Sequence, residues 1–69
     1  HLSEDGFEQI GVIPRNEKDV LKVRKGTYWN IEVIDIRWFT NDKISRKGVR
    51  VNREEARLLL NLLRRELDE

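Results

Sequence analysis

Hydrophobic and polar residues alternate along most of the chain, and the period of this pattern changes near residue 52. Segments in which every second residue is apolar or β-branched predict strands that bury one face. Proline, glycine, asparagine and aspartate separate these segments and predict turns. Strands are expected at residues 7–13, 20–25, 28–39 and 46–52, with turns at residues 14–19, 25–27 and 40–45. Short connections between successive strands predict an antiparallel meander.

The last part of the chain has the period of an amphipathic helix. Asn52 is a favourable N-cap, and Glu55 three residues later completes a capping box. The helix is expected to end near residue 67, and its apolar stripe consists of Ala56, Leu59, Leu60, Leu63 and Leu67. Leu58 and Leu62 fall outside this stripe, so the apolar band is wider than one sheet face needs. We expect these two leucines at a dimer interface.

This order of elements predicts an α+β fold with four antiparallel strands and a C-terminal helix, ββββα. The helix is expected to cover one face of the sheet and to leave the other open. Residues 1–6 are expected to form a flexible lead and residues 7–69 a single domain. A domain of this size buries only about 60% of its unfolded surface. The chain has no cysteine, so we expect a homodimer to supply the additional burial.

The longest expected strand has an imperfect alternation. Ile31 and Val33 share a face with Arg37, whereas Ile34 and Ile36 take the other face. A β-bulge in this strand would explain the pattern, and so would burial of part of the second face by a partner subunit. The sequence leaves both explanations open.

Charge is distributed unevenly although the net charge is only +1. Residues 1–14 carry a net charge of −3, and residues 54–69 carry −2. Between them, residues 15–53 contain eleven Lys or Arg against five Asp or Glu, a net charge of +6. A basic block between acidic ends predicts a polyanionic partner. The alternative is an ordinary solvated surface rich in lysine and arginine.

The residue types that catalysis needs are scarce. The chain has no cysteine, and its one histidine is His1. Glu32 and Asp35 lie three apart on one strand, so they point to opposite faces and cannot act as a carboxylate pair. Ser45 has no histidine base. We therefore expect no enzymatic activity, no cofactor and no metal site. No apolar run reaches the length of about 20 residues that a membrane span needs, and we expect an intracellular protein that does not bind membranes.

A binding surface is better supported. If the apolar residues of the strands face the core, the open face collects cations from three strands, with aromatic rings among them. The residues predicted on this face are Lys22, Arg24, Trp29, Arg37, Phe39 and Arg50. A flexible single strand suits such a surface, because cations follow its phosphates and its bases stack on the rings. A duplex has its bases already stacked and would use only the charges.

Several of these residues have ordinary structural alternatives. Trp38 falls on the core side and is expected to pack there. Tyr28 and Trp29 can instead pack against each other at the end of the hairpin. Arg37 can instead pair with Asp35 or Glu32 of a neighbouring strand. Gly48 is expected where a larger side chain would block a close approach of the backbone.

The run "IEVIDIRWFTNDKISRKGVRVNREEARLLLNLL", residues 31–63, resembles the C-terminal domain of the transcriptional coactivator called positive cofactor four. The shared features are the "IDIR" strand, the "RKG" segment and the helix that follows, and "FEQIGVI" resembles the first strand of that family. The resemblance implies a curved four-stranded sheet with a helix, homodimerisation, binding of single-stranded DNA and no enzymatic activity. The eukaryotic coactivator's serine-rich tail is missing, which favours a bacterial, archaeal or phage-type member or a trimmed domain.

Family roles pass to the matching positions of this chain. Arg37 matches the strand arginine, "RKG" is Arg46, Lys47 and Gly48, and Tyr28 or Trp29 matches the aromatic that stacks on a base. The chain departs from the family at residue 40, where a threonine replaces an aromatic residue, and in a shorter turn before "RKG". The full set of expected nucleic-acid-binding residues is Lys22, Arg24, Tyr28, Trp29, Arg37, Phe39, Arg46, Lys47, Gly48 and Arg50.

The sequence therefore predicts a homodimeric protein that binds single-stranded DNA with little sequence preference. It would act in transcription, replication or repair, with the transcription machinery as a further partner. Its expected location is the cytoplasm or nucleoid of a prokaryote, or the nucleus of a eukaryote. Two alternatives remain, which are a module that docks acidic protein surfaces and an RNA-binding protein that uses the same surface.

Overall fold

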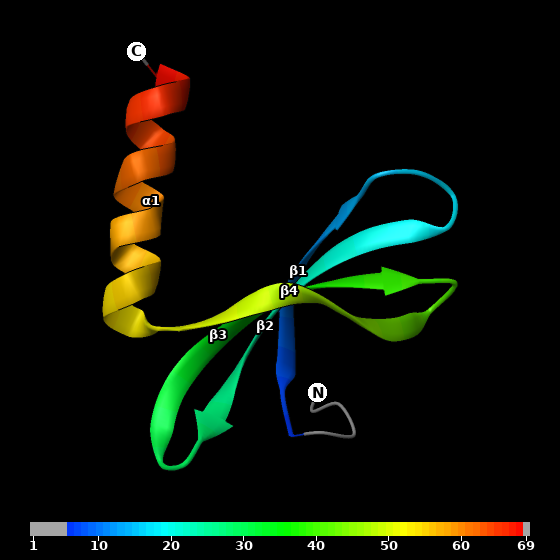
Figure 1. Cartoon of the computed structure of the whole chain (residues 1–69), viewed down its shortest axis with the longest axis horizontal. Coiled ribbons are helices and arrows are strands. Elements are labelled where there is room, and N and C mark those ends of the chain that lie inside the picture. Colours follow the sequence, from blue (N-terminus) through cyan, green and yellow to red (C-terminus); the bar gives the residue numbers. More distant parts are fainter. Residues whose placement is uncertain (1–5, 69) are drawn as a thin grey trace.

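A computed structural model describes residues 6–68 of the chain. It contains four antiparallel strands and one helix: β1 (Glu8–Pro14), β2 (Asp19–Tyr28), β3 (Ile31–Thr40), β4 (Lys43–Asn52) and α1 (Arg53–Asp68). The strands form one open, strongly twisted sheet in the order β1-β2-β3-β4 (Figure 1). The predicted ββββα fold is confirmed. The lead expected at residues 1–6 lies outside the described residues, except for Gly6.

Strands β2, β3 and β4 are joined by two-residue turns that are tighter than expected. Trp29 and Asn30 have φ of 54° and 63°, and Asn41 and Asp42 have φ of 52° and 65°. Two successive positive φ values are the signature of the type I′ turn, whose twist matches that of the flanking strands. The turn predicted at residues 25–27 is wrong, because β2 continues through this segment.

Gly26 has a different role from the turn glycine that the sequence suggested. It lies inside β2, and a Cβ atom there would come within 2.8 Å of the ring of Phe7. Phe7 is one of the two buried apolar residues among those described, and the other is Val33. The glycine therefore makes room for an aromatic ring that covers this end of the sheet.

The register of the strands assigns each side chain to one of two faces. The first face, which we call the basic face, carries Lys22, Arg24, Asp35, Arg37, Phe39, Arg46 and Arg50. The second, which we call the apolar face, carries Leu21, Val23, Ile34, Ile36, Trp38, Val49 and Val51. The predicted placement of Lys22, Arg24, Arg37 and Arg50 on one face agrees with this register. The register also places Val20, Tyr28, Ile31, Val33 and Ile44 on the basic face, and Lys25 and Glu32 on the apolar face. The pairing of β2 with β3 is unbroken from Asp19↔Thr40 to Tyr28↔Ile31, so no bulge there explains the mixed pattern of β3.

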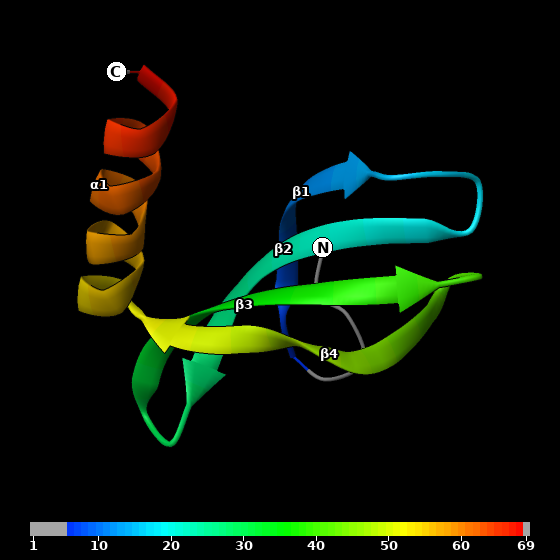
Figure 2. The same ribbon diagram turned by 45° about the horizontal axis from the view of Figure 1, so that its top comes forward.

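The helix begins as the sequence predicts. The Asn52 amide donates to Glu55 Oε1 at 2.9 Å, and the Glu55 amide donates to Asn52 Oδ1 at 2.7 Å, which forms the capping box. However, no helix residue is buried. The prediction that α1 covers a sheet face is wrong within one chain. Asn52 is both the last residue of β4 and the N-cap, so no loop exists that would fold the helix back (Figure 2).

The helix therefore projects from the sheet, and both apolar surfaces stay uncovered in the single chain. Residues of the apolar face are half-buried or exposed, and Leu58 and Leu62 of α1 are 57% and 58% exposed. Within residues 6–68, no helix has the length and apolar character that crossing a membrane requires.

Candidate nucleic-acid interface

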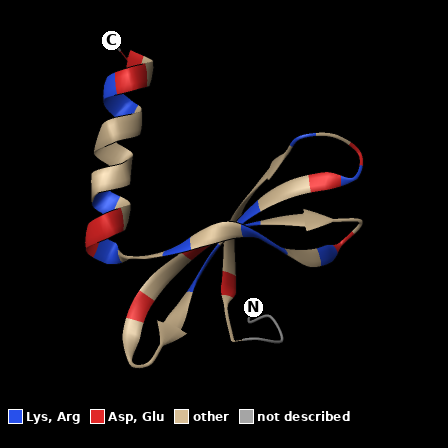
Figure 3. Cartoon of the chain, in the orientation of Figure 1, with Lys and Arg blue, Asp and Glu red and all other residues tan. Residues whose placement is uncertain are grey.

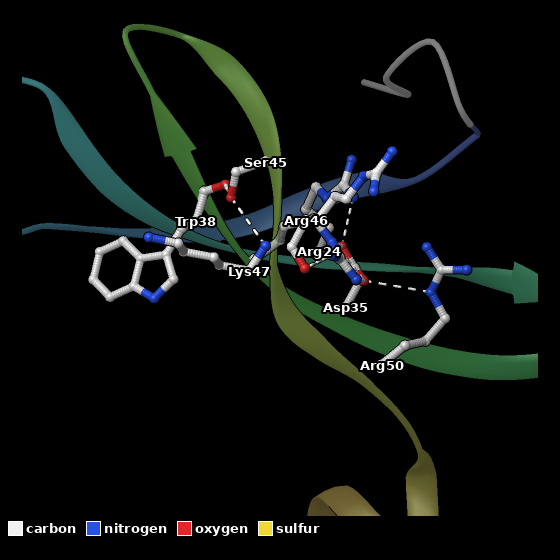
Figure 4. Close-up of polar contacts among 8 residues, drawn as sticks. Arg24, Asp35, Trp38, Ser45, Arg46, Lys47 and Arg50 are labelled. Atoms are coloured by element: carbon white, nitrogen blue, oxygen red, sulfur yellow. Dashed lines mark hydrogen bonds and ion pairs between the residues drawn. The ribbon is translucent and has the colours of Figure 1, made fainter.

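Asp35 lies at the centre of the basic face and is fully enclosed, with 0% of its surface exposed. Three arginines reach its carboxylate from three adjacent strands, and Figure 4 shows Arg24 and Arg50 beside it. Arg24 Nη2 on β2 lies 2.5 Å from Oδ2, Arg37 Nη2 on β3 lies 2.9 Å from Oδ1, and Arg50 Nε on β4 lies 3.4 Å from Oδ1. Arg24 and Arg50 are the direct cross-strand partners of Asp35, so the register itself brings the charges together.

The arginines keep this buried carboxylate ionised. Burial raises the pKa of Asp35, but the hydrogen bonds and charges of Arg37 and Arg24 outweigh burial and bring the pKa below its usual 3.8. Among residues 6–68, one carboxylate of this cluster faces three guanidinium groups. A buried ion pair of this kind is costly to break, because removal of one partner leaves an uncompensated charge.

The three arginines differ in how far they reach the surface. Arg24 is 3% exposed and lies beneath the face on which it was expected. The Arg37 side chain is partly accessible, and the Arg50 side chain is the most accessible of the three. Arg24 is therefore a structural partner of Asp35, whereas Arg50 has surface to offer a ligand.

Strand β4 contains a large bulge next to this cluster. Arg37 pairs with Gly48 and Phe39 pairs with Ile44, so the three residues Ser45–Lys47 lie opposite Trp38 alone. The two extra residues preserve the alternation of side chains. Arg46 therefore points to the basic face, and Lys47 points to the apolar face, toward Trp38 (Figure 4).

Hydrogen bonds fix the shape of the bulge. The Ser45 hydroxyl donates to the Trp38 carbonyl oxygen at 2.7 Å and accepts from the Lys47 amide at 3.2 Å. Arg37 Nη1 donates to the Arg46 carbonyl oxygen at 3.1 Å. The bulge is thus tied to β3 on both sides.

Gly48 closes the bulge where no other residue fits. Its φ is +154°, and a Cβ atom would meet the Ile36 carbonyl oxygen and lie 2.8 Å from Arg37 Cα. Both are backbone contacts that a side-chain rotation cannot relieve. The close approach expected at Gly48 is therefore present, and the backbone of β3 is what approaches it.

An open depression of about 530 Å³ lies between the bulge and the arginine cluster. It is lined by Arg37, Ile44, Ser45, Arg46 and Arg50. Because the depression is shallow and cationic, it suits an anionic group on a long chain better than an enclosed small molecule. Figure 3 shows Lys and Arg gathered where the strands cross in the middle of the sheet.

Aromatic rings and cations alternate across the basic face. Arg50 lies over Tyr28 and Phe7, with its Cζ 5.0 and 4.8 Å from the ring centroids. Arg24 lies between Phe7 and Phe39, at 5.1 and 5.4 Å from their centroids. Each ring supports a cation in the free protein, and such contacts stabilise by about 0.5–2 kcal/mol. The sequence assigned Phe7 to the first strand and missed its place in this row.

The row ends at Lys22, whose Nζ lies 4.3 Å from the Phe39 ring centroid. At the other end, Trp29 forms the tip of the hairpin beside Tyr28, with the two rings edge to face and 6.0 Å apart. Trp29 is 80% exposed and has a φ of 54°. A bulky side chain in the left-handed region is strained, and strain at an exposed aromatic residue points to a functional role.

The structure brings most of the expected site residues together. Those on the basic face are Lys22, Arg24, Tyr28, Arg37, Phe39, Arg46, Gly48 and Arg50, and Trp29 borders it at the hairpin tip. Lys47 does not join them. It shares the apolar face with Trp38, whose ring is covered by Arg15 at 3.9 Å.

Ser45 is a site residue that the sequence missed, and Asp35 was expected only as an alternative partner of Arg37. The pairing alternative for Arg37 is present, but the carboxylate belongs to its own strand. A signal for Asp35 existed, because it shares parity with Arg37 and interrupts an apolar strand. Ser45 had no such signal, because its role depends on the bulge.

Comparison of the chain with protein-family models, with curated protein sequences and with solved structures finds no match. Among residues 6–68, no three His, Cys, Asp or Glu side chains are grouped as metal ligands would be. The chemistry of the basic face therefore carries the functional assignment.

Proposed function

We propose that the chain is a single-stranded DNA-binding protein that uses its basic face with little sequence preference, in transcription, replication or repair. The observation that supports this most is the collection of cations from three strands around a single carboxylate. The other strand carboxylates of the described chain, Glu8, Asp19 and Glu32, all fall on the opposite side of the sheet. A polyanion on the basic face thus meets almost no repulsion.

The aromatic rings favour a single strand over a duplex. Trp29 and Tyr28 are exposed at one end of the basic face, and Phe39 lies farther along it. Unpaired bases stack on such rings and gain about 1–3 kcal/mol each. A duplex cannot offer its base faces without unstacking. The resemblance of residues 31–63 to the positive cofactor four family supports the same proposal.

We also propose that the working form is a homodimer joined through α1, with Leu58 and Leu62 at the interface. Two apolar surfaces are uncovered in one chain, and a second copy can cover both. The middle of the helix, residues 58–63, is uncharged, and charges of both signs lie at its two ends: Arg53, Glu54, Glu55 and Arg57 at the start, and Arg64, Arg65, Glu66 and Asp68 at the end (Figure 3). Two helices packed along this uncharged segment would bury their leucines without burying a charge.

Fluorescence anisotropy with labelled oligothymidine tests the DNA-binding proposal. The comparison ligands are a duplex of the same length and polyglutamate, all at matched salt. Oligothymidine should bind most tightly, and log K should fall with log salt by about 0.7 per phosphate contact. Equal affinity for single strand and duplex at moderate salt would contradict the proposal. Tighter binding of polyglutamate would favour docking of acidic protein surfaces instead.

A further inference from the structure

Arg37 is held at all three of its nitrogens by the protein itself. Its Nε donates to Asp35 Oδ2 at 3.2 Å, and its Nη2 donates to Asp35 Oδ1 at 2.9 Å. Its Nη1 donates to the Arg46 backbone carbonyl at 3.1 Å. A guanidinium group has five N–H donors in a fixed fork, so these bonds set both its position and its plane. Arg37 is therefore a cross-link between β3 and the bulge as well as a charge.

The other end of this link is also rigid. The Asp35 carboxylate is enclosed and is held by Arg24, whose side chain is buried. A continuous chain of charge-assisted hydrogen bonds thus runs from Arg24 through Asp35 and Arg37 to the carbonyl of Arg46. Such bonds are short and roughly twice as strong as those between neutral groups.

The bulge at the end of this chain presents a cation to the open depression. Ser45 ties the bulge to Trp38, and Gly48 allows its close approach to β3. The Arg46 side chain lines the same depression as Arg50. The direction in which Arg46 leaves the strand therefore depends on the bonds that hold the bulge backbone.

We infer that Asp35 and Arg37 are positioning residues that set the shape of the bulge, while Arg46 and Arg50 supply the phosphate contacts. This inference rests on the proposed function and specifies how the site is built. Asp35 would then support DNA binding by holding Arg37, although its own negative charge repels the phosphates. The geometry of Arg37 would also be more important than its charge.

Asp35→Asn should change DNA affinity in opposite directions, depending on whether Asp35 acts by positioning Arg37 or by its charge alone. If only charge mattered, Asp35→Asn would remove a negative charge from the basic face and tighten binding to DNA. Loss of the anchor for Arg37 should instead weaken binding, despite the added positive charge. The two accounts also differ at Arg37→Lys, because lysine keeps the charge but cannot bridge Asp35 and the Arg46 carbonyl.

Oligothymidine affinity and its salt dependence should be measured for Arg37→Lys, Asp35→Asn and Ser45→Ala, with Arg57→Lys on α1 as the matched control. Arg57→Lys makes the same exchange at an exposed helix residue away from the basic face, so its affinity should stay within about threefold of wild type. Arg37→Lys and Ser45→Ala should bind oligothymidine about tenfold more weakly. A tenfold loss of affinity corresponds to about the free energy of one hydrogen bond, here one that positions the bulge. Their salt slopes should be unchanged, because the phosphate contacts are the same in number.

Asp35→Asn can fail to fold, because the buried Arg24 would lose its charged hydrogen bond to Asp35. Circular dichroism identifies that case, and Arg37→Lys and Ser45→Ala then decide the question. Arg37→Lys binding within threefold of wild type, or a folded Asp35→Asn protein that binds more tightly, would overturn the inference. Absence of binding by the wild-type protein is a separate result, which overturns the proposed function together with the inference.

Discussion

Substitution of Gly48 by alanine should be strongly destabilising, and the cost follows from the geometry of the bulge. The new Cβ would meet the Ile36 carbonyl oxygen and lie 2.8 Å from Arg37 Cα and 3.2 Å from Arg37 Cβ. A non-glycine residue in a sparsely populated φ region costs about 1–3 kcal/mol by itself. Displacement of the β3 backbone adds to this, so we expect a total of about 3 kcal/mol or more.

Alanine substitutions at two other glycines give stability changes with which Gly48→Ala can be compared. At Gly11 no atom lies within 4 Å of the added Cβ, so Gly11→Ala should change stability by less than about 0.5 kcal/mol. At Gly26 the Cβ meets the ring of Phe7, which is a side chain. Gly26→Ala is an overpacking change that should cost about 1–3 kcal/mol. The expected order of stability is therefore Gly11→Ala, then Gly26→Ala, then Gly48→Ala.

Urea and thermal unfolding followed by far-ultraviolet circular dichroism measure these differences. All variants must be compared at one protein concentration, because the stability of the proposed dimer would depend on it. For a domain of this size, about 1 kcal/mol corresponds to about 4–8 °C in Tm. A Gly48→Ala protein as stable as Gly11→Ala would show that the bulge can rearrange freely, and would refute the view that β3 holds it in place.

Three further predictions follow from other parts of the molecule. The pKa of Asp35 is lowered in the folded state. The contribution of this carboxylate to stability should therefore be complete above about pH 5 and lost as pH falls through the folded pKa. A Tm that stays constant from pH 5 to pH 2.5 would contradict this prediction. Leu58→Glu combined with Leu62→Glu should convert the proposed dimer to a folded monomer in sedimentation experiments, because neither side chain is buried within one chain. A monomeric wild-type protein would contradict the proposed interface. Trp29→Asn should raise the free energy of unfolding by about 1 kcal/mol, since asparagine tolerates the left-handed conformation. The same variant should bind oligothymidine more weakly, because one stacking ring is lost. A destabilised variant would show that the ring packs on its own hairpin.

The sequence predicted the features that depend on near neighbours along the chain. Alternation assigned Lys22 and Arg37 to one face and Leu21 and Ile36 to the other, because a strand has a strict period of two. The capping box at Asn52 is equally local, since its two hydrogen bonds join residues three apart. These features do not require knowledge of which elements meet in space.

The bulge in β4 could not be predicted from the pattern. An insertion of two residues preserves the alternation, so Arg46 keeps the side that an uninterrupted strand would give it. The sequence also could not show that Gly26 faces the ring of Phe7, because a glycine between lysine and threonine has the composition of a turn. Trp29 is a poor candidate for a type I′ turn by propensity, and the cross-strand register overrides that preference.

The course of the helix was the main error, and its cause is equally physical. A leucine stripe predicts that a helix is covered by something, but it does not say by what. Because Asn52 ends β4 and caps α1 at once, the helix leaves the sheet directly. Its apolar residues are therefore available to a second chain.

The two tryptophans provide the most direct test of the central claim, that an unpaired strand lies on the basic face. Trp29 borders this face, whereas Trp38 lies on the apolar face beneath Arg15. Fluorescence should be titrated with oligothymidine in Trp38→Phe, which keeps Trp29, and in Trp29→Phe, which keeps Trp38. Binding should quench Trp29 and leave Trp38 nearly unchanged. Quenching of Trp38 alone would place the strand on the apolar face and contradict the account.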